Sequence, residues 1–130
     1  MRAARILVVD DNPTNLKLAS EVLEAEGHEI LRAVNAEEAI AVIAKTPPDL
    51  ILMDIALPGM DGLTLTRQLK ADPATRHIVV VALTAFAMKG DEAKAQAAGC
   101  DGYITKPIDT RALARQIESV TAQRQTPPAP

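Results

Sequence analysis

Acidic residues stand directly after two strongly apolar runs of this chain. Asp10 and Asp11 follow the run ILVV, and Asp54 follows the run LILM. Two more polar residues, Thr84 and Lys106, stand at the ends of later apolar runs. An acidic pair can hold a hard divalent cation such as Mg²⁺, and a further carboxylate can act as a nucleophile. Together with a hydroxyl and an ammonium, these groups suit phosphoryl transfer, whose transition state spreads negative charge over three oxygens. These residue types therefore predict phosphoryl chemistry, provided that the fold brings them together.

The apolar runs alternate with stretches of helical periodicity. Short runs rich in β-branched residues and leucine predict five strands, over residues 5–9, 29–33, 49–53, 78–82 and 102–105. Helix caps and helical spacing predict five helices, from Asn12 to Gly27, from Asn35 to Pro47, after the loop 57–60 to about Ala71, from about Ala87 to Ala98, and from Asp109 onward.

This alternation predicts an α/β fold with a parallel sheet. Runs such as ILVV, LILM and IVVV are apolar on consecutive positions, which is typical of strands covered by helices on both faces. We expect a flavodoxin-like (βα)5 doubly wound sheet with strand order 2-1-3-4-5. In that order the ends of the first and third strands border one crevice, so Asp10, Asp11 and Asp54 should converge there.

Size and composition restrict the class of protein. With 130 residues the chain suits one compact domain, and its net charge of −3 argues against broad nucleic-acid binding. We predict a domain over residues 1–122 and a disordered, proline-rich tail over 123–130.

The lone Cys100 permits no internal disulfide and fits a reducing cytoplasm. No signal peptide and no apolar run long enough to cross a bilayer is evident, so we expect a cytoplasmic protein without membrane insertion.

The ordered set Asp10-Asp11, Asp54, Thr84 and Lys106-Pro107 resembles the receiver (CheY-like) domain of two-component response regulators. The resemblance extends over residues 4–122. It implies that Asp54 is the phosphoacceptor and that Mg²⁺ is bound by Asp11, by Asp54, by the backbone carbonyl of Ala56 and, through water, by Asp10. It also implies that Thr84 and Lys106 contact the phosphoryl group, that the Lys106-Pro107 bond is cis, and that Tyr103 is an aromatic side chain that turns inward on activation.

Within this family, the stretches ALTAFAMKGDE and YITKPI resemble single-domain cell-cycle regulators of the DivK type, and also receivers of hybrid histidine kinases. The resemblance implies a signalling switch rather than an enzyme with a separate substrate. Its partners would be a sensor histidine kinase or a histidine phosphotransfer protein, together with a downstream protein. The switching face would comprise the fourth helix, fifth strand and fifth helix, with these candidate residues: Phe86, Met88, Tyr103, Arg111 and Arg115. The alternative is a receiver from a hybrid kinase or larger regulator that acts as a relay or phosphate sink.

Two positions tune the lifetime of the phosphate in this family, namely those two residues after Asp54 and two residues after Thr84. They are Ala56 and Phe86 in this chain. Neither side chain can orient an attacking water, so we expect slow self-dephosphorylation.

Three other functions fit the sequence less well. A phosphatase with an aspartyl nucleophile would usually carry a second Asp where this chain has Ala56. A flavin or dinucleotide binder would need a glycine fingerprint after the first strand, which is absent. A receiver that has lost phosphorylation would not need the intact acidic set. His28 and His77 are predicted to be surface residues without a role in phosphotransfer.

Overall fold

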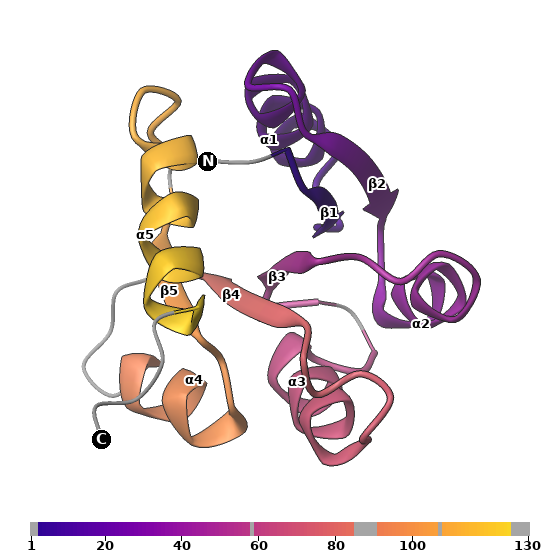
Figure 1. The fold of residues 1–130 in the computed structure, drawn as a ribbon. Helices are drawn as coiled ribbons and strands as arrows, with labels where there is room; N and C mark the ends of the chain where they lie inside the picture. The colour runs from indigo at the N-terminus through magenta and orange to yellow at the C-terminus, as the bar shows by residue number, and fades with distance from the viewer. Residues whose placement is uncertain (1–2, 58, 85–90, 107, 126–130) are drawn as a thin grey trace.

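A five-stranded parallel sheet forms the centre of the computed structural model, which describes residues 3–57, 59–84, 91–106 and 108–125, with only the backbone of residues 91, 92 and 123–125 (Figure 1). The strands lie in the order β2-β1-β3-β4-β5, and every neighbouring pair is parallel. The predicted strand order is therefore confirmed. Their bounds are β1 Arg5–Val9, β2 Glu29–Ala33, β3 Leu50–Asp54, β4 Val79–Thr84 and β5 Gly102–Thr105.

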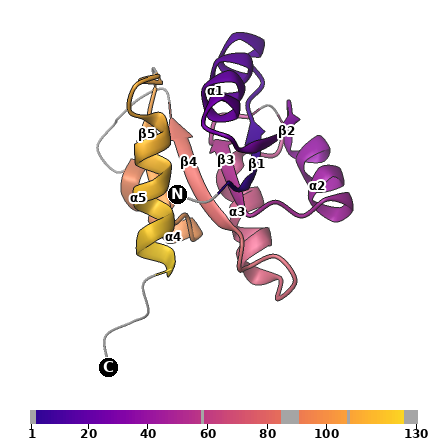
Figure 2. The same ribbon diagram turned by 45° about the horizontal axis from the view of Figure 1, so that its top comes forward.

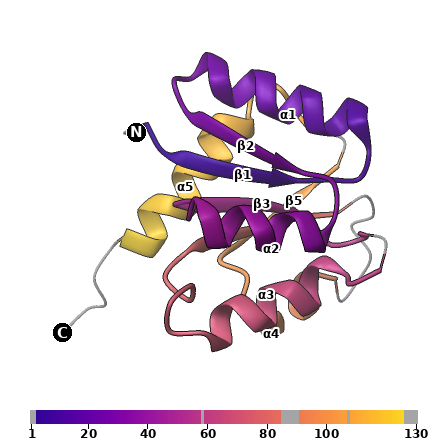
Figure 3. The ribbon, with the colours of Figure 1, turned by 90° about the vertical axis from the view of Figure 1, so that its right-hand side faces the viewer.

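Five helices cover the two faces of this sheet (Figures 1 and 2). Side chains of α1 and α5 pack against one face, and side chains of α2 and α3 pack against the other. Figure 3 shows α1 above the strands β2 and β1, with α2 and α3 next to each other on the opposite side of the sheet. The helices span α1 Pro13–Ala25, α2 Ala36–Lys45, α3 Gly62–Ala71, α4 Asp91–Ala98 and α5 Leu113–Gln125.

Successive residues of the inner strands enter different cores, which explains their unbroken apolar runs. In β1, Ile6 and Val8 pack with α1 and α5, whereas Leu7 and Val9 pack with α2 and α3. All four side chains are fully buried. Adjacent side chains of a strand point to opposite faces, so a strand covered on both faces needs apolar residues at every position.

Short polar side chains begin three of the helices. Asn12 accepts hydrogen bonds from the backbone N–H groups of Thr14 and Asn15, and Pro13 follows at the first helical position. Asn35 accepts the N–H of Glu38, and Asp61 accepts that of Thr64. These bonds pair donors that the first turn of a helix leaves without an internal partner. They fix where each helix starts behind the strand that precedes it.

Several predicted boundaries differ from the structure. β3 runs on through Asp54 and β4 through Thr84, because both residues still pair with the neighbouring strand. Asp109 caps a turn that ends before α5: its carboxylate accepts the N–H of Arg111, and its carbonyl accepts the N–H of Leu113. Residues 85–90, where α4 was predicted to begin, lie outside the described residues. The disordered tail was predicted to begin at residue 123, but α5 continues to Gln125. Residues 126–130 lie outside the described residues, so their disorder stays a prediction.

The prediction of a surface position was wrong for His28. Its side chain is only 7% exposed, and its Nδ1 accepts the backbone N–H of Ala4 at 3.0 Å. This bond joins segments 24 residues apart, so the local sequence carries no sign of it. His77 is exposed, as predicted.

Candidate functional site

The carboxyl edge of the sheet gathers the residues that the sequence singled out. Asp10 follows β1, Asp54 ends β3, Thr84 ends β4, and Lys106 follows β5. Asp10 is 1% exposed, while Asp54 and Thr84 are 3% exposed each. Burying carboxylates costs free energy unless each finds a partner, so their contacts indicate what this edge is built to hold.

The two carboxylate oxygens of Asp54 have different partners. Oδ1 accepts the backbone N–H of Ala56 at 2.9 Å, while Oδ2 lies 3.1 Å from Nζ of Lys106. The next residue, Ile55, donates its N–H to the carbonyl of Leu83 at 3.1 Å, which ties the end of β3 to β4. The carboxylate therefore has a fixed orientation at the edge of the sheet.

Asp10 is held as closely, but one of its oxygens is incompletely satisfied. Its N–H donates to the carbonyl of Ala33 at 3.1 Å, and its Oδ1 accepts the N–H of Asn12 at 2.9 Å. Its Oδ2 is buried and lies 3.0 Å from Nζ of Lys106 as an ion pair, yet it makes no hydrogen bond of good geometry with any described residue. A buried carboxylate oxygen with only a charge contact has capacity for a further ligand.

Lys106 joins the two acidic residues to β4. Its backbone N–H donates to the carbonyl of Thr84 at 2.6 Å, and its side chain is 13% exposed. Burial by itself would lower the pKa of the Lys106 ammonium, but the nearby carboxylates of Asp10 and Asp54 outweigh it and raise that pKa. The ammonium is thus a fixed positive charge at this edge.

A metal ion fits the acidic group. Among the described residues, Asp10, Asp11 and Asp54 offer carboxylate oxygens that all lie within 4.8 Å of one another. Burial raises the pKa of Asp10, and the opposing effects of the Asn12 N–H and of the Lys106 ammonium do not cancel it. The three carboxylates carry more negative charge than the ammonium of Lys106 can offset, and a hard cation with oxygen ligands would balance the remainder. Asp11, which is exposed, keeps the group open to solvent.

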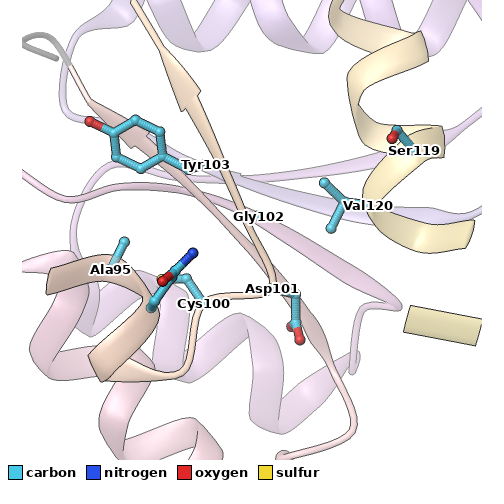
Figure 4. Close-up of a pocket in the computed structure, with 8 residues that line it drawn as sticks. Ala95, Cys100, Asp101, Gly102, Tyr103, Ser119 and Val120 are labelled. Carbon is cyan, nitrogen blue, oxygen red and sulfur yellow. The ribbon is translucent and has the colours of Figure 1, made fainter. Parts of the chain in front are cut away.

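The remaining predicted site residues occupy different positions. Ala56 is exposed, and its N–H holds Asp54. Tyr103 is half-buried on β5 and lines a hollow of about 350 Å³ between α4 and α5, away from the acidic group. Figure 4 shows its ring extending away from Val120 of α5. Arg111 and Arg115 are exposed. The residues Phe86, Met88 and Pro107, with the predicted cis bond, lie outside the described residues.

Three contributors were missed at the sequence level. The N–H of Asn12 and the carbonyl of Ala33 position Asp10, although Asn12 was interpreted only as a helix cap. Gly62 packs against the backbone of Asp54, where a Cβ would lie 2.3 Å from the Asp54 carbonyl oxygen. A backbone N–H or carbonyl is available at a position whatever its side chain, so the type of residue does not reveal such a contribution. A glycine at the first position of a helix was the one available signal.

Comparison with known proteins gives the family. Residues 6–118 match the model of the response regulator receiver domain. The chain is a response regulator receiver domain. It is 46% identical to the polar-differentiation response regulator DivK of Brucella anthropi, over 88% of this receiver domain and 93% of that protein.

Solved structures agree with this assignment. A putative response regulator from Chloroflexus aurantiacus superposes on the receiver domain with a TM-score of 0.88 and 31% identity, over 93% of this chain and 99% of that one. The signal receiver domain of a signal transduction histidine kinase from Syntrophus aciditrophicus superposes with a TM-score of 0.84 and 33% identity, over 98% of this chain and 97% of that one. In the described part of the receiver domain, each helix is too short or too polar to cross a membrane.

Proposed function

We propose that this receiver domain accepts a phosphoryl group on Asp54 from a phosphohistidine and thereby switches a surface that a partner protein reads. The observation that carries this proposal is the buried arrangement in which Lys106 contacts both Asp54 and Asp10. An ammonium fixed between a nucleophile and a metal-binding carboxylate offsets negative charge where it develops during phosphoryl transfer. The donor would be a sensor histidine kinase or a histidine phosphotransfer protein, and the setting would be the cytoplasm.

In the reaction, an oxygen of Asp54 attacks the phosphorus of phosphohistidine. A P–O bond forms while the P–N bond breaks, and its electron pair stays on the ring nitrogen. The donor leaves as a neutral imidazole when its other ring nitrogen carries a proton. The Ala56 N–H at 2.9 Å and the Lys106 ammonium at 3.1 Å hold the carboxylate in one orientation, which lowers the entropic part of the barrier.

Asp10, Asp11 and Asp54 would hold a magnesium ion, with the carbonyl of Ala56 as the further ligand that the family implies. When bound, Mg²⁺ would offset the negative charge of the phosphoryl oxygens and of the three carboxylates. Lys106 contributes a second positive charge from the protein itself, and Thr84 contributes a hydroxyl to a phosphoryl oxygen.

The switch would act through the end of β4. Thr84 and Lys106 are linked by a backbone hydrogen bond of 2.6 Å, so a movement of the Thr84 side chain toward the phosphoryl group occurs beside β5. Tyr103 lies on β5, half-buried, where it can change its packing. The partner surface would be the face of α4, β5 and α5, including Tyr103 and the exposed Arg111 and Arg115. A phosphorylation-dependent shift between two packings would transmit the signal.

The second candidate is a relay or phosphate sink. It is favoured by the similarity to the receiver domain of a histidine kinase from Syntrophus aciditrophicus. The two candidates differ in the direction of phosphate flow. A relay would return the phosphoryl group to a histidine phosphotransfer protein within minutes of mixing, whereas an adaptor would retain it and bind its partner more tightly.

The direct test uses phosphoramidate, a small donor with a P–N bond. Intact-mass spectrometry of the purified receiver domain should show the addition of one phosphoryl group with Mg²⁺ and much less with EDTA. Asp11→Asn should reduce the addition as EDTA does, because it removes a carboxylate from the metal group. Asp109→Asn is the matched control, since that exposed carboxylate lies in a turn outside the site. Equal labelling with and without Mg²⁺ would contradict the proposal.

A further inference from the structure

Gly62 occupies the first position of α3 and is buried, yet its backbone does not need a glycine. The glycines with positive φ in the described chain are Gly27, Gly59 and Gly99, so Gly62 has a conformation that any residue can adopt. A helix start normally accepts alanine at little cost. The reason for glycine must therefore be space around the residue rather than backbone conformation.

The space is taken by the backbone of the phosphoacceptor. A Cβ on Gly62 would lie 2.3 Å from the carbonyl oxygen of Asp54 and 2.9 Å from Cα of Ile55. It would also lie 2.9 Å from Cγ of Met53. The Met53 side chain can rotate away, whereas the peptide of Asp54 cannot. Real Cβ contacts essentially never fall below 3.0 Å, so the Asp54 carbonyl or the start of α3 would have to move.

This contact closes the loop that carries the site. The N–H of Gly62 donates to the carbonyl of Ile55 at 3.3 Å, and the Gly62 carbonyl accepts the hydroxyl of Thr66 at 2.8 Å. The loop from Ile55 to Gly62 contains Ala56, whose N–H donates to the Asp54 carboxylate. A displacement at Gly62 therefore reaches the carboxylate both through the Asp54 backbone and through the Ala56 amide.

We propose that Gly62 is a positioning residue for phosphotransfer: the absence of its side chain lets α3 dock on Asp54 and sets where the Asp54 carboxylate lies. The inference rests on the proposed function, because it takes Asp54 as the nucleophile. The contact must lengthen from 2.3 Å to at least 3.0 Å in Gly62→Ala. A misplacement approaching 1 Å at a reacting group costs up to about 10²-fold in rate, so we expect Gly62→Ala to be phosphorylated about 10- to 100-fold more slowly.

A matched control exists in the same chain. Gly102, on β5, also has a negative φ, and a Cβ there would lie 2.4 Å from Cγ2 of Val120. Gly102→Ala therefore adds a methyl group to an equally crowded place without touching Asp54. The double variant Gly102→Ala/Val120→Ala removes that overlap and should recover stability, which shows how much of the cost is steric.

The experiment measures the phosphorylation rate by phosphoramidate over a range of donor concentrations, with each rate divided by the folded fraction from circular dichroism. It also measures the affinity for Mg²⁺ from the thermal shift. We expect Gly62→Ala to lower the maximal rate and the Mg²⁺ affinity, and Gly102→Ala to change only the melting temperature. If Gly62→Ala is unfolded in plain buffer, both variants are compared in sucrose, which favours the compact state.

Two results would overturn the inference: equal corrected rates for Gly62→Ala and Gly102→Ala, or wild-type Mg²⁺ affinity in Gly62→Ala. If the proposed function is wrong, the wild-type chain itself takes up no phosphoryl group, which distinguishes that failure from failure of the inference about Gly62. In that case the Mg²⁺ affinities of the two variants still decide whether Gly62 positions Asp54.

Discussion

The ammonium of Lys106 lies 3.1 Å from Oδ2 of Asp54, although 52 residues separate the two in the chain. Its second contact, 3.0 Å from Oδ2 of Asp10, makes it the positive charge shared by two buried carboxylates. This placement connects the ends of β1, β3 and β5 in one group of charges.

Lys106→Met should slow phosphorylation by about 10²-fold, the effect typical of removing one preorganised donor from a transition state. The measurement is the rate of phosphoramidate-dependent mass gain, corrected for folded protein. Lys70→Met is the control, because Lys70 makes a partly buried ion pair of 2.9 Å with Asp101 away from Asp54. Lys70→Met should lose stability and keep its rate. A wild-type rate in Lys106→Met would contradict the assignment.

Asp10→Asn should stabilise the fold when no metal is present. The substitution removes the charge of a buried carboxylate whose Oδ2 lacks a good hydrogen bond, while Lys106 keeps Asp54 as a partner. We expect a gain of about 1 to 2 kcal/mol in the free energy of unfolding in EDTA, measured by urea denaturation.

Addition of Mg²⁺ should make the wild-type chain more stable than Asp10→Asn, which reverses the order of stability expected in EDTA. The wild-type chain should gain stability from the ion, and Asp10→Asn should gain less, because one carboxylate of the metal group is missing. Equal gains in both proteins would show that Asp10 does not help to hold the ion.

Ala56 predicts a long-lived phosphate. Its methyl side chain cannot orient a water molecule for attack, so loss of the phosphoryl group should take minutes or longer. Ala56→Asn introduces a group that can hydrogen-bond water and should shorten the lifetime, by up to about 10²-fold, the lower end for a positioned proton-transfer group. Leucine has nearly the same shape as asparagine but cannot hydrogen-bond water, so Ala56→Leu should leave the lifetime of the phosphate long. Equal lifetimes in Asn and Leu variants would count against the explanation.

Cys100 gives a pH dependence away from the site. Burial raises the pKa of its thiol, with smaller effects from Thr66 and Asp101. Alkylation by iodoacetamide should therefore be slower in the native chain than in urea, with its midpoint above the ordinary value of about 8.5. An unshifted midpoint in the native protein would be inconsistent with the partly buried thiol of Cys100.

The same shift sets the sign of a stability effect. As pH rises above the unfolded pKa, the unfolded thiol loses its proton first, so the native state binds more protons and the free energy of unfolding falls. The fall ends once the pH passes the folded pKa. Cys100→Ala should lack this decrease, which is measured by urea denaturation between about pH 8 and 11.

Much of the fold was predictable because it depends on local patterns. The unbroken run before Asp54 indicated a strand buried on both faces, and Asn12 and Asn35 marked two helix starts that the structure confirms. The convergence of Asp10, Asp11 and Asp54 followed from strand order alone, and their carboxylates do lie together.

What could not be predicted depends on contacts between distant backbone groups. The Ala33 carbonyl holds the N–H of Asp10, and the Ala4 N–H binds the buried imidazole of His28. Neither bond follows from the type of residue at Ala33 or Ala4. The close approach of Gly62 to Asp54 is of the same kind, since it is visible only once α3 is placed behind β3.

The role of Asp54 as phosphoacceptor is tested most directly by locating the phosphoryl group. The receiver domain is phosphorylated with phosphoramidate and Mg²⁺, reduced with borohydride, which converts an aspartyl phosphate to homoserine, and mapped by peptide mass spectrometry. Homoserine is expected at position 54 and nowhere else, and no conversion is expected in Asp54→Asn. Homoserine at another acidic residue of the wild-type chain, or phosphorylation of Asp54→Asn at the wild-type rate, would contradict this role of Asp54.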